Sequence, residues 1–263
     1  MISENTSLPI HNLSGRKPSP IIIAHRGASY LAPENTLSSV NLAWELGADA
    51  VEVDVRLTKD KKIILLHDET TKRTAGFELP VGETPYDELM KIDIGSFIFP
   101  EYEGEKIPLL NEVIETIPKG RRLFVEIKSG PEIIPVLKKL IDFSGKRYHI
   151  SLMGFECETV VRCKAAMPEI PAYLLCRTAR QVDTAKYISY DSHIINNVMK
   201  SKLDGVNVEY HGITSEFVNE VMASGLEIFV WTVNDVKEAK RLRDLDVKGI
   251  TTDRPGCIKN NLK

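Results

Sequence analysis

Cysteine is scarce in this sequence, which has four in 263 residues: Cys157, Cys163, Cys176 and Cys257. None of them forms a Cys-x-x-Cys pair, and their spacing matches no zinc site. So few cysteines, spread over a chain of this length, are typical of free thiols in a reducing cytosol. We therefore expect neither a disulfide framework nor a zinc-binding module.

Long apolar runs are missing as well. No segment approaches the ~20 apolar residues that a membrane-spanning helix needs. Residues 1–20 are polar where a secretory signal would carry an apolar stretch. We interpret residues 1–19 as a flexible tail and expect no membrane span. Together with the cysteine content, this favours a cytoplasmic location.

Charge of one sign is not in excess, because 34 basic residues face 37 acidic ones and the formal net charge is −3. This balance gives the chain no overall electrostatic attraction to nucleic acid or anionic lipid. The 43% hydrophobic content excludes a disordered chain, and 16 glycines with 14 prolines exclude a collagen-like one. At 263 residues the chain is near the upper limit for a single hydrophobic core.

Short apolar segments, rich in β-branched residues, alternate with amphipathic segments along the chain. This alternation predicts parallel strands joined by helices, and eight strands in about 250 residues are typical of a (β/α)8 TIM barrel. An open doubly wound sheet is the main rival, but no Gly-x-Gly-x-x-Gly follows the first strand. We expect one strand each near residues 22, 52, 125, 150, 173, 207, 229 and 250.

Two connections are too long for the regular spacing of a barrel. Residues 69–107 carry nine acidic and four basic side chains, a local charge of −5, and we interpret them as a cap subdomain inserted after the second barrel strand region. Residues 177–203 are mostly polar and predict a helix with a mobile loop. The predicted organisation is one barrel domain over residues 20–263 that contains this insertion.

Ionisable side chains interrupt the predicted strands near their carboxyl ends, where parallel barrels build their active sites. They are His25 and Arg26 at the end of the first strand, Glu52 and Asp54 on one face of the second, His67 after the next extended segment, and Glu126 with Lys128 on one face of the third. Trp231 lies near the end of the seventh strand, where it is equally well explained as barrel core.

Three of these side chains are carboxylates that would point into one barrel: Glu52, Asp54 and Glu126. Left alone they would repel one another, and at least one would take a proton. Carboxylate oxygens are preferred ligands of Mg²⁺ and Ca²⁺, so a divalent cation would resolve the repulsion. The alternative is that Glu52 and Asp54 are solvated or paired with the nearby Arg56.

The two histidines that end strands, His25 and His67, suggest an acid–base pair, because imidazole titrates near neutral pH. The other four histidines are read as surface or core residues. Arg26 and Lys128 would add positive charge, and with a cation they would form a site for an anion, most naturally a phosphoryl group. Alternatively, they only balance the carboxylates.

Together these motifs resemble the glycerophosphodiester phosphodiesterase family. Residues 24–74, which include AHRG, PENT, VEVDV and LLHDE, resemble its signature almost without interruption. FVEIKSG at 124–130, VWTVND at 230–235 and GITTDRP at 249–255 resemble its later strand-end motifs. The resemblance spans roughly residues 20–256, and several separate motifs occur in the right order.

The resemblance implies a metal-dependent barrel enzyme that hydrolyses glycerophosphodiesters to sn-glycerol 3-phosphate and an alcohol, through a cyclic phosphate. It also implies that residues 69–107 cap the mouth and shape substrate choice. Matched position by position, the resemblance implies that His25 and His67 are the general acid and base. It implies that Glu52, Asp54 and Glu126 bind the metal and that Arg26 and Lys128 contact the phosphate. It also places Glu34 near the metal and Trp231 on the glycerol side of the pocket.

One departure and two rival functions remain. The fourth strand ends in Leu152–Glu156 (LMGFE), where the family more often has a Ser-Phe-Asn or Ser-Phe-Asp sequence, so polar pocket contacts from that strand are in doubt. A related phosphodiesterase acting on lysophospholipids or phosphoinositides would need an apolar entrance. Aromatic and aliphatic residues of the insertion would form that entrance or, as we favour, its own small core: Phe77, Phe97, Ile98, Phe99 and Tyr102.

The second rival is a non-catalytic sensor of a phosphate ligand, which would not need both histidines and all three carboxylates. We expect a small-molecule glycerophosphodiester as the partner, no nucleic acid, and a divalent cofactor, Mg²⁺ or Ca²⁺. The preferred head group, the choice of metal and the oligomeric state, monomer or homodimer, stay open.

Overall fold

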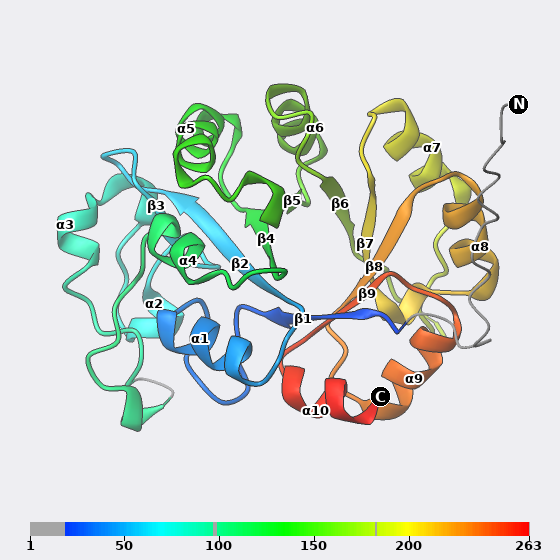
Figure 1. Cartoon of the computed structure of the whole chain (residues 1–263), viewed down its shortest axis with the longest axis horizontal. Coiled ribbons are helices and arrows are strands. Elements are labelled where there is room, and N and C mark those ends of the chain that lie inside the picture. The colour runs from blue at the N-terminus through cyan, green and yellow to red at the C-terminus, as the bar shows by residue number, and fades with distance from the viewer. Residues whose placement is uncertain (1–18, 97–98, 182, 263) are drawn as a thin grey trace, which may run out of the picture.

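The computed structural model describes residues 19–96, 99–181 and 183–262, so the predicted tail, apart from Ser19, lies outside the described residues. Eight parallel strands close into a barrel because β1 pairs with both β2 and β9. This confirms the predicted (β/α)8 barrel and each of its eight strand positions (Figure 1). The barrel strands are β1 (Ile21–His25), β2 (Ala50–Leu57), β4 (Arg122–Ile127), β5 (Ile150–Gly154), β6 (Ala172–Cys176), β7 (Gly205–Glu209), β8 (Glu227–Trp231) and β9 (Gly249–Thr252).

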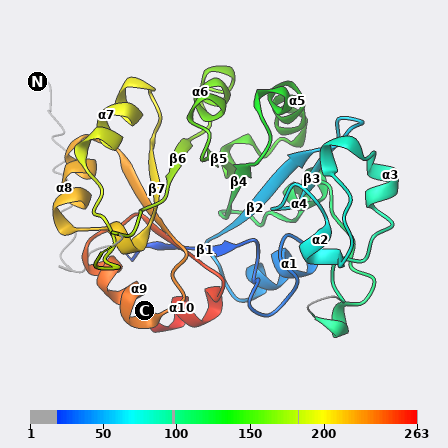
Figure 2. The same ribbon diagram turned by 180° about the vertical axis from the view of Figure 1, so that it is seen from behind.

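A ring of helices surrounds the barrel, as the two opposite views show (Figures 1 and 2). Four of them begin at a Thr or Asp whose side chain accepts a hydrogen bond from a backbone N–H of the first turn: Thr36, Asp191, Thr214 and Asp235. Each such cap is worth about 1 kcal/mol. The helices are α1 (Leu37–Glu45), α4 (Leu110–Thr116), α5 (Ile134–Ser144), α6 (Cys157–Ala166), α7 (Ser192–Lys200), α8 (Ser215–Ala223), α9 (Val236–Asp244) and α10 (Pro255–Asn261).

Strand β2 shows how the sequence pattern builds both sides of the barrel wall. Val51, Val53 and Val55 pack in the large core between strands and helices. The alternate residues Glu52 and Asp54 therefore face the barrel interior, since successive side chains of a strand point to opposite faces. All five side chains are buried.

Aromatic side chains fill the barrel interior below its mouth. Phe124, Tyr173 and Phe229 pack against one another with ring centroids 4.8 to 6.0 Å apart, and the Tyr173 hydroxyl donates to Glu227 Oε2 at 2.6 Å. Gly249 makes room for them, because a Cβ there would lie 2.7 Å from the ring of Phe229. The lower part of the barrel is thus a packed core.

Strand β3 (Ile63–Leu65) runs antiparallel to the far half of β2, with Val55 opposite Leu65. Beyond it the chain leaves the barrel and forms α2 (Lys72–Ala75), α3 (Tyr86–Leu89) and two 3-10 turns, Val81–Glu83 and Pro100–Tyr102. Other 3-10 turns, at Pro131–Ile133, Arg147–His149 and Tyr210–Gly212, join barrel elements.

The inserted segment has a core of its own, but the aliphatic residues form it: Ile64, Leu66, Val81, Leu89, Ile92, Ile94 and Ile107. Phe77 is 50% exposed, so its predicted place in that core is wrong. Phe99 and Tyr102 are half-buried and pack edge to face, and Phe97 and Ile98 lie outside the described residues. The hydroxyl of Ser38 on α1 donates to Glu105 and ties the segment to the barrel.

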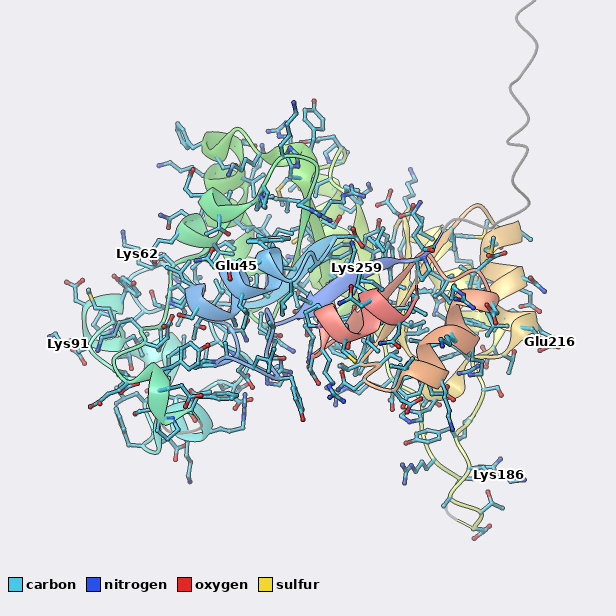
Figure 3. The ribbon with its side chains drawn as sticks, turned by 60° about the horizontal axis from the view of Figure 1, so that its bottom comes forward. Glu45, Lys62, Lys91, Lys186, Glu216 and Lys259 are labelled. Atoms are coloured by element: carbon cyan, nitrogen blue, oxygen red, sulfur yellow. The ribbon has the colours of Figure 1, made fainter. Side chains whose placement is uncertain are left out.

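The second long connection contains the predicted helix, α7, after a loop that projects from the barrel. Figure 3 shows this loop by its labelled residue Lys186, with the inserted segment (Lys91) at the other end of the molecule. Among the described residues no helix combines the length and the apolar character needed to cross a membrane. The cytoplasmic location stays a prediction.

Candidate active site

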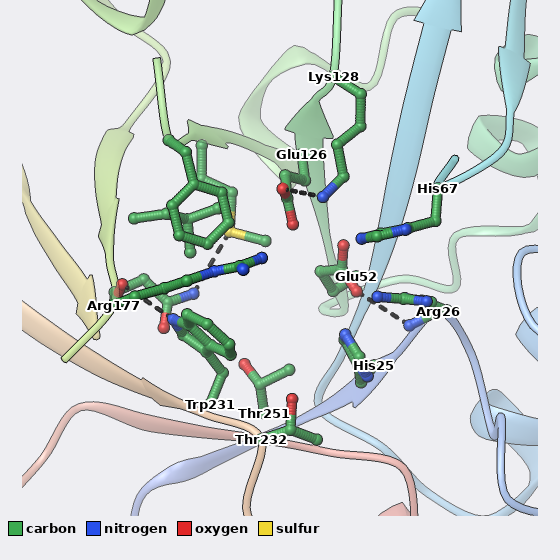
Figure 4. A pocket seen from close by; sticks show the side chains of 14 residues that line it. His25, Arg26, Glu52, His67, Glu126, Lys128, Arg177, Trp231, Thr232 and Thr251 are labelled. Carbon is green, nitrogen blue, oxygen red and sulfur yellow. Dashed lines mark hydrogen bonds and ion pairs between the residues drawn. The ribbon is translucent and has the colours of Figure 1, made fainter. Parts of the chain in front are cut away.

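A cavity of about 170 Å³ opens at the carboxyl ends of the barrel strands. Seven of the nine predicted site residues line it, and Asp54 and Glu34 lie outside its wall (Figure 4). The lining residues are His25, Arg26, Glu52, His67, Glu126, Lys128, Met153, Phe155, Leu175, Arg177, Asn207, Trp231, Thr232 and Thr251.

Strand β2 brings the two histidines to the same place because it runs past the end of β1. Its near half pairs with β1, so that His25 stands opposite Glu52. Its far half pairs with β3, and the main-chain N–H of Leu66 donates to Asp54 O at 3.1 Å. His67 follows directly, and therefore lies beside Asp54 just beyond the end of β1.

The turn after β1 sets the position of Arg26. Arg26 and Gly27 both have left-handed backbone torsions, with φ of +54° and +83°. A Cβ at Gly27 would collide with Ser39 of α1, so only glycine fits this close approach. In this conformation the Arg26 N–H donates to Glu52 Oε2 at 2.9 Å, and its side chain reaches Asp54 and Glu34.

Three buried carboxylates form a cluster at the edge of the pocket. Glu52, Asp54 and Glu126 each offer an oxygen within 4.8 Å of the others. Asp54 faces Arg26 Nε at 3.1 Å and Lys128 Nζ at 3.2 Å, and Lys128 also pairs with Glu126. Arg56 instead donates to the main-chain oxygens of His67 and Lys128. The alternative of solvated or Arg56-paired carboxylates is therefore wrong.

The three carboxyl groups of this cluster differ in pKa. Burial, and then the charge of Asp54, raise the pKa of Glu52 to about 8. Burial also raises the pKa of Glu126. For Asp54, burial acts in the same sense but is outweighed by Arg26 and Lys128, so its pKa falls to about 2.

The cluster fits a hard divalent cation. Among the residues that the structure describes, Glu52 Oε1 is buried without a hydrogen-bond partner. No hydrogen bond from these residues satisfies Asp54 Oδ1 or Glu126 Oε1, each of which forms an ion pair with Lys128. All three donors are carboxylate oxygens, which suit Mg²⁺ or Ca²⁺. A cation held here would favour the ionised form of all three side chains.

Each histidine is held through Nδ1 by a carboxylate. His25 Nδ1 lies 2.6 Å from Asp253 Oδ1, and His67 Nδ1 lies 2.6 Å from Asp68 Oδ1. Nε2 is then the ring nitrogen left for the pocket. Burial lowers the pKa of His67 below its usual value. At His25 burial acts the same way, but the Asp253 hydrogen bond and Glu52 outweigh it and raise the pKa.

The two aspartates that hold the histidines, Asp253 and Asp68, were not among the site residues predicted from the sequence. Ser29 and Asn234 donate to Asp253; burial opposes its charge, yet the partners, His25 first, lower its pKa to about 2. Arg73 Nε donates to Asp68 Oδ2 at 2.6 Å. The available signals were the adjacency of Asp68 to His67 and the strand-end position of Asp253 in GITTDRP.

Glu34 contacts cations and not the carboxylate cluster. It accepts hydrogen bonds from Arg26 and from both terminal nitrogens of Arg73, each at 2.8 Å. Its pKa is lowered, because these arginines outweigh the effect of burial. Asn35 beside it donates from Nδ2 to Asp54 Oδ2 at 2.9 Å. The PENT segment thus orients Arg26 and Asp54.

The other half of the pocket is aromatic. Trp231 and Phe155 meet edge to face with centroids 5.6 Å apart, and the Arg177 guanidinium lies 4.7 Å from the Phe155 centroid and 5.8 Å from that of Trp231. The unusual end of the fourth barrel strand therefore supplies an apolar wall, Met153 and Phe155. Arg177 was also not predicted as a pocket residue, because nothing in the sequence distinguishes one basic residue in a polar loop from the others.

The sequence profile of the glycerophosphoryl diester phosphodiesterase family matches residues 25–257. The chain belongs to this family. The glycerophosphodiester phosphodiesterase of Caldanaerobacter subterraneus subsp. tengcongensis (strain DSM 15242 / JCM 11007 / NBRC 100824 / MB4) is 31% identical over 248 residues, which are 91% of this chain and 96% of the relative. Human lysophospholipase D GDPD1 is 25% identical over 271 residues, covering 91% and 85%.

Among solved structures, an Oleispira antarctica phosphodiesterase in complex with the product sn-glycerol-3-phosphate superposes with a TM-score of 0.81, at 28% identity and over 92% of this chain and 96% of that one. The predicted resemblance is confirmed. As a glycerophosphodiester phosphodiesterase, the chain is an enzyme that hydrolyses glycerophosphodiesters. The sensor alternative is therefore wrong.

Proposed function

We propose that this phosphodiesterase works by metal-dependent acid–base catalysis, with His25 and His67 as the proton-transfer groups. One observation carries the proposal: two imidazoles, each fixed through Nδ1 by a carboxylate, face one pocket beside a buried carboxylate cluster and two cations. The products are sn-glycerol 3-phosphate and an alcohol.

The charged half of the pocket binds the phosphodiester. Arg26 and Lys128 neutralise its negative charge and stabilise the charge that develops on the five-coordinate phosphorus. Glu52, Asp54 and Glu126 would hold a divalent cation, which supplies further stabilisation of the same charge when bound. Because Glu34 and Arg73 hold Arg26 from outside, its guanidinium is oriented before substrate arrives.

The reaction proceeds in two displacements. Nε2 of one histidine takes the proton of the glycerol 2-hydroxyl, whose oxygen bonds to phosphorus, while the other histidine protonates the departing alcohol as its P–O bond breaks. Water then attacks the cyclic phosphate, loses its proton to the second histidine, and the first histidine returns a proton to the 2-oxygen. Both histidines end in their starting state.

The test is release of sn-glycerol 3-phosphate from a panel of glycerophosphodiesters, with enzyme treated with chelator and then supplied with Mg²⁺, Ca²⁺ or Mn²⁺. We expect chelation to abolish turnover and one or more of these ions to restore it. Full turnover by metal-free enzyme would overturn the metal-dependent part of the proposal, and its histidine part would then rest on the variants described in the Discussion.

A second candidate substrate class is the lysophospholipids, because three large apolar side chains in the loop after β1 and in the inserted segment are at least half exposed: Tyr30, Leu31 and Phe77 (50 to 57%). Tyr30 and Leu31 lie in the loop that follows β1, and Phe77 lies in the inserted segment. Comparing choline release from glycerophosphocholine and from lysophosphatidylcholine distinguishes the two classes.

A further inference from the structure

The floor of the pocket contains two buried polar side chains whose oxygen atoms lack partners. Asn207 on β7 and Thr251 on β9 are each 1% exposed, and both line the cavity. Within the described part of the chain, Asn207 Oδ1 and Thr251 Oγ1 have no hydrogen-bond partner. A buried polar atom left unsatisfied costs free energy, so such atoms are rare without a ligand or water to pair with.

The side chains packed next to these atoms are largely apolar. Phe229 stands opposite Asn207 on the adjacent strand and packs with Phe124 and Tyr173. Beside them, Trp231 Nε1 donates at 3.1 Å to the main-chain oxygen of Asn207 and not to its side chain. Both residues line the pocket, so a ligand bound there can supply the missing partners.

The amide of Asn207 is oriented by Met153. Its Nδ2 donates to Met153 Sδ at 3.3 Å, and since a thioether sulfur can only accept, this contact keeps the nitrogen on the Met153 side. Oδ1 is left as a pure acceptor. Thr251 Oγ1 can donate and accept, so each of the two atoms can pair with a hydroxyl group of a ligand, which both donates and accepts.

These two residues stand in the half of the pocket away from the carboxylate cluster. Val230 pairs with Ile250, so Trp231 and Thr251 occupy neighbouring positions on adjacent strands. Figure 4 shows Trp231 and Thr251 together, across the cavity from Lys128. A substrate whose phosphate is held by Arg26 and Lys128 would extend its glycerol arm over this floor.

We infer that Asn207 and Thr251 bind a free terminal hydroxyl on the glycerol arm, and so select deacylated glycerophosphodiesters over lysophospholipids, in which that hydroxyl is esterified. The inference rests on the proposed function of the same site. An ester oxygen cannot donate to Asn207, and it would leave that buried acceptor unpaired. Sites built to bind a hydroxyl reject analogues that lack it far more strongly than apolar pockets discriminate by size.

The test compares glycerophosphocholine with its analogue in which the terminal CH₂OH is CH₃ and the 2-hydroxyl is retained. We expect wild type to prefer the natural substrate in kcat/KM by about tenfold or more. Thr251→Val and Asn207→Leu should each lose about tenfold on the natural substrate and little on the analogue, which shrinks the preference. Thr251→Ser should retain the preference because it keeps the hydroxyl.

Thr159→Val is the matched control. Thr159 on α6 is 1% exposed and its Oγ1 also lacks a partner, but it lies outside the pocket wall. Neither Thr→Val change should lower Tm, since each removes an unsatisfied buried hydroxyl. Only Thr251→Val should alter the substrate preference.

A second measurement does not depend on the head group. Calorimetry would measure the affinity of Mg²⁺-supplied enzyme, wild type and the same variants, for sn-glycerol 3-phosphate and for its 1-deoxy analogue. Equal affinity of wild type for both ligands, or equal losses on both ligands in Thr251→Val, would overturn the inference. Failure of the proposed function looks different, because wild type would then release no sn-glycerol 3-phosphate from any diester.

Discussion

The two halves of the pocket differ in how their cations and histidines, or their neutral polar groups, are held, although the carboxylate cluster of the charged half also keeps unpaired oxygens among the described residues. In the charged half, Arg26, Lys128, His25 and His67 each have a carboxylate partner at 3.2 Å or less. In the aromatic half, Asn207 and Thr251 keep unpaired oxygens and Arg177 rests on ring faces. The difference teaches that the proposed phosphate site has its cations and histidines positioned before binding, while the proposed contacts to the glycerol arm would be completed by the ligand.

The strongest effect should come from the charged half. His25→Ala and His67→Ala each remove a proton-transfer group, so kcat should fall by about 10²–10⁴-fold. Steady-state release of sn-glycerol 3-phosphate measures this, with His193→Ala on exposed α7 as the control. Wild-type turnover in either variant would refute the histidine pair.

A smaller loss is expected when the support of a histidine is weakened. Asp253→Asn keeps the shape but removes the charge that orients His25 and raises its pKa, so kcat should fall about 10–100-fold. The pH–rate profile distinguishes this from general damage, because the titration assigned to His25 should move to lower pH. An unshifted profile would contradict the positioning role of Asp253. Asp244→Asn, on the surface of α9, is the control.

The unpaired oxygen of Glu52 makes the stability of the metal-free protein depend on pH. Its folded pKa of about 8 lies above the ordinary value of 4.5. Stability linked to this group is therefore fully present below pH 4.5 and is lost as the pH rises through 8. We expect Tm of the metal-free enzyme to fall over this range, and Glu52→Gln to flatten the fall. An added divalent cation should restore Tm in wild type only.

The smallest effect should come from the rim of the aromatic half. Arg177→Ala removes a cation that lies over Phe155 and Trp231, an arrangement worth about 0.5–1 kcal/mol at exposed sites. KM should change by roughly threefold while kcat is retained, with Arg162→Ala on α6 as the control. A hundredfold fall in kcat would instead place Arg177 at the reacting atoms.

The barrel and the charged half were predictable from the sequence because their signals are local. Short apolar runs that alternate with amphipathic segments predicted every barrel strand, and ionisable residues such as His25 and Glu126 are conspicuous at the ends of apolar strands. Glu52 and Asp54 were expected to act alike, yet Asp54 sits outside the pocket wall, held by Asn35, Arg26 and Lys128.

The aromatic half could not be predicted in the same way. In the sequence, Asn207 lies between two valines and Thr251 lies beside Thr252. Both look like ordinary strand residues, because threonine favours strands and a single asparagine forms no recognisable motif. Their significance depends on what lies beneath and beside them, which only the closed barrel shows. Likewise His67 was seen to follow an extended segment, but its place in the same pocket as His25 depends on β2 running past β1.

The aromatic layer of Phe124, Tyr173 and Phe229 fills the barrel interior below the pocket. Substrate and products are therefore expected to pass through the mouth at the carboxyl ends of the strands. Under the proposed mechanism the alcohol departs first, and the glycerol phosphate, whose glycerol arm would lie over Asn207 and Thr251, leaves last. An enzyme with this exit order is subject to competition between its retained product and the next substrate, and its output would therefore respond to the surrounding concentration of glycerol phosphate.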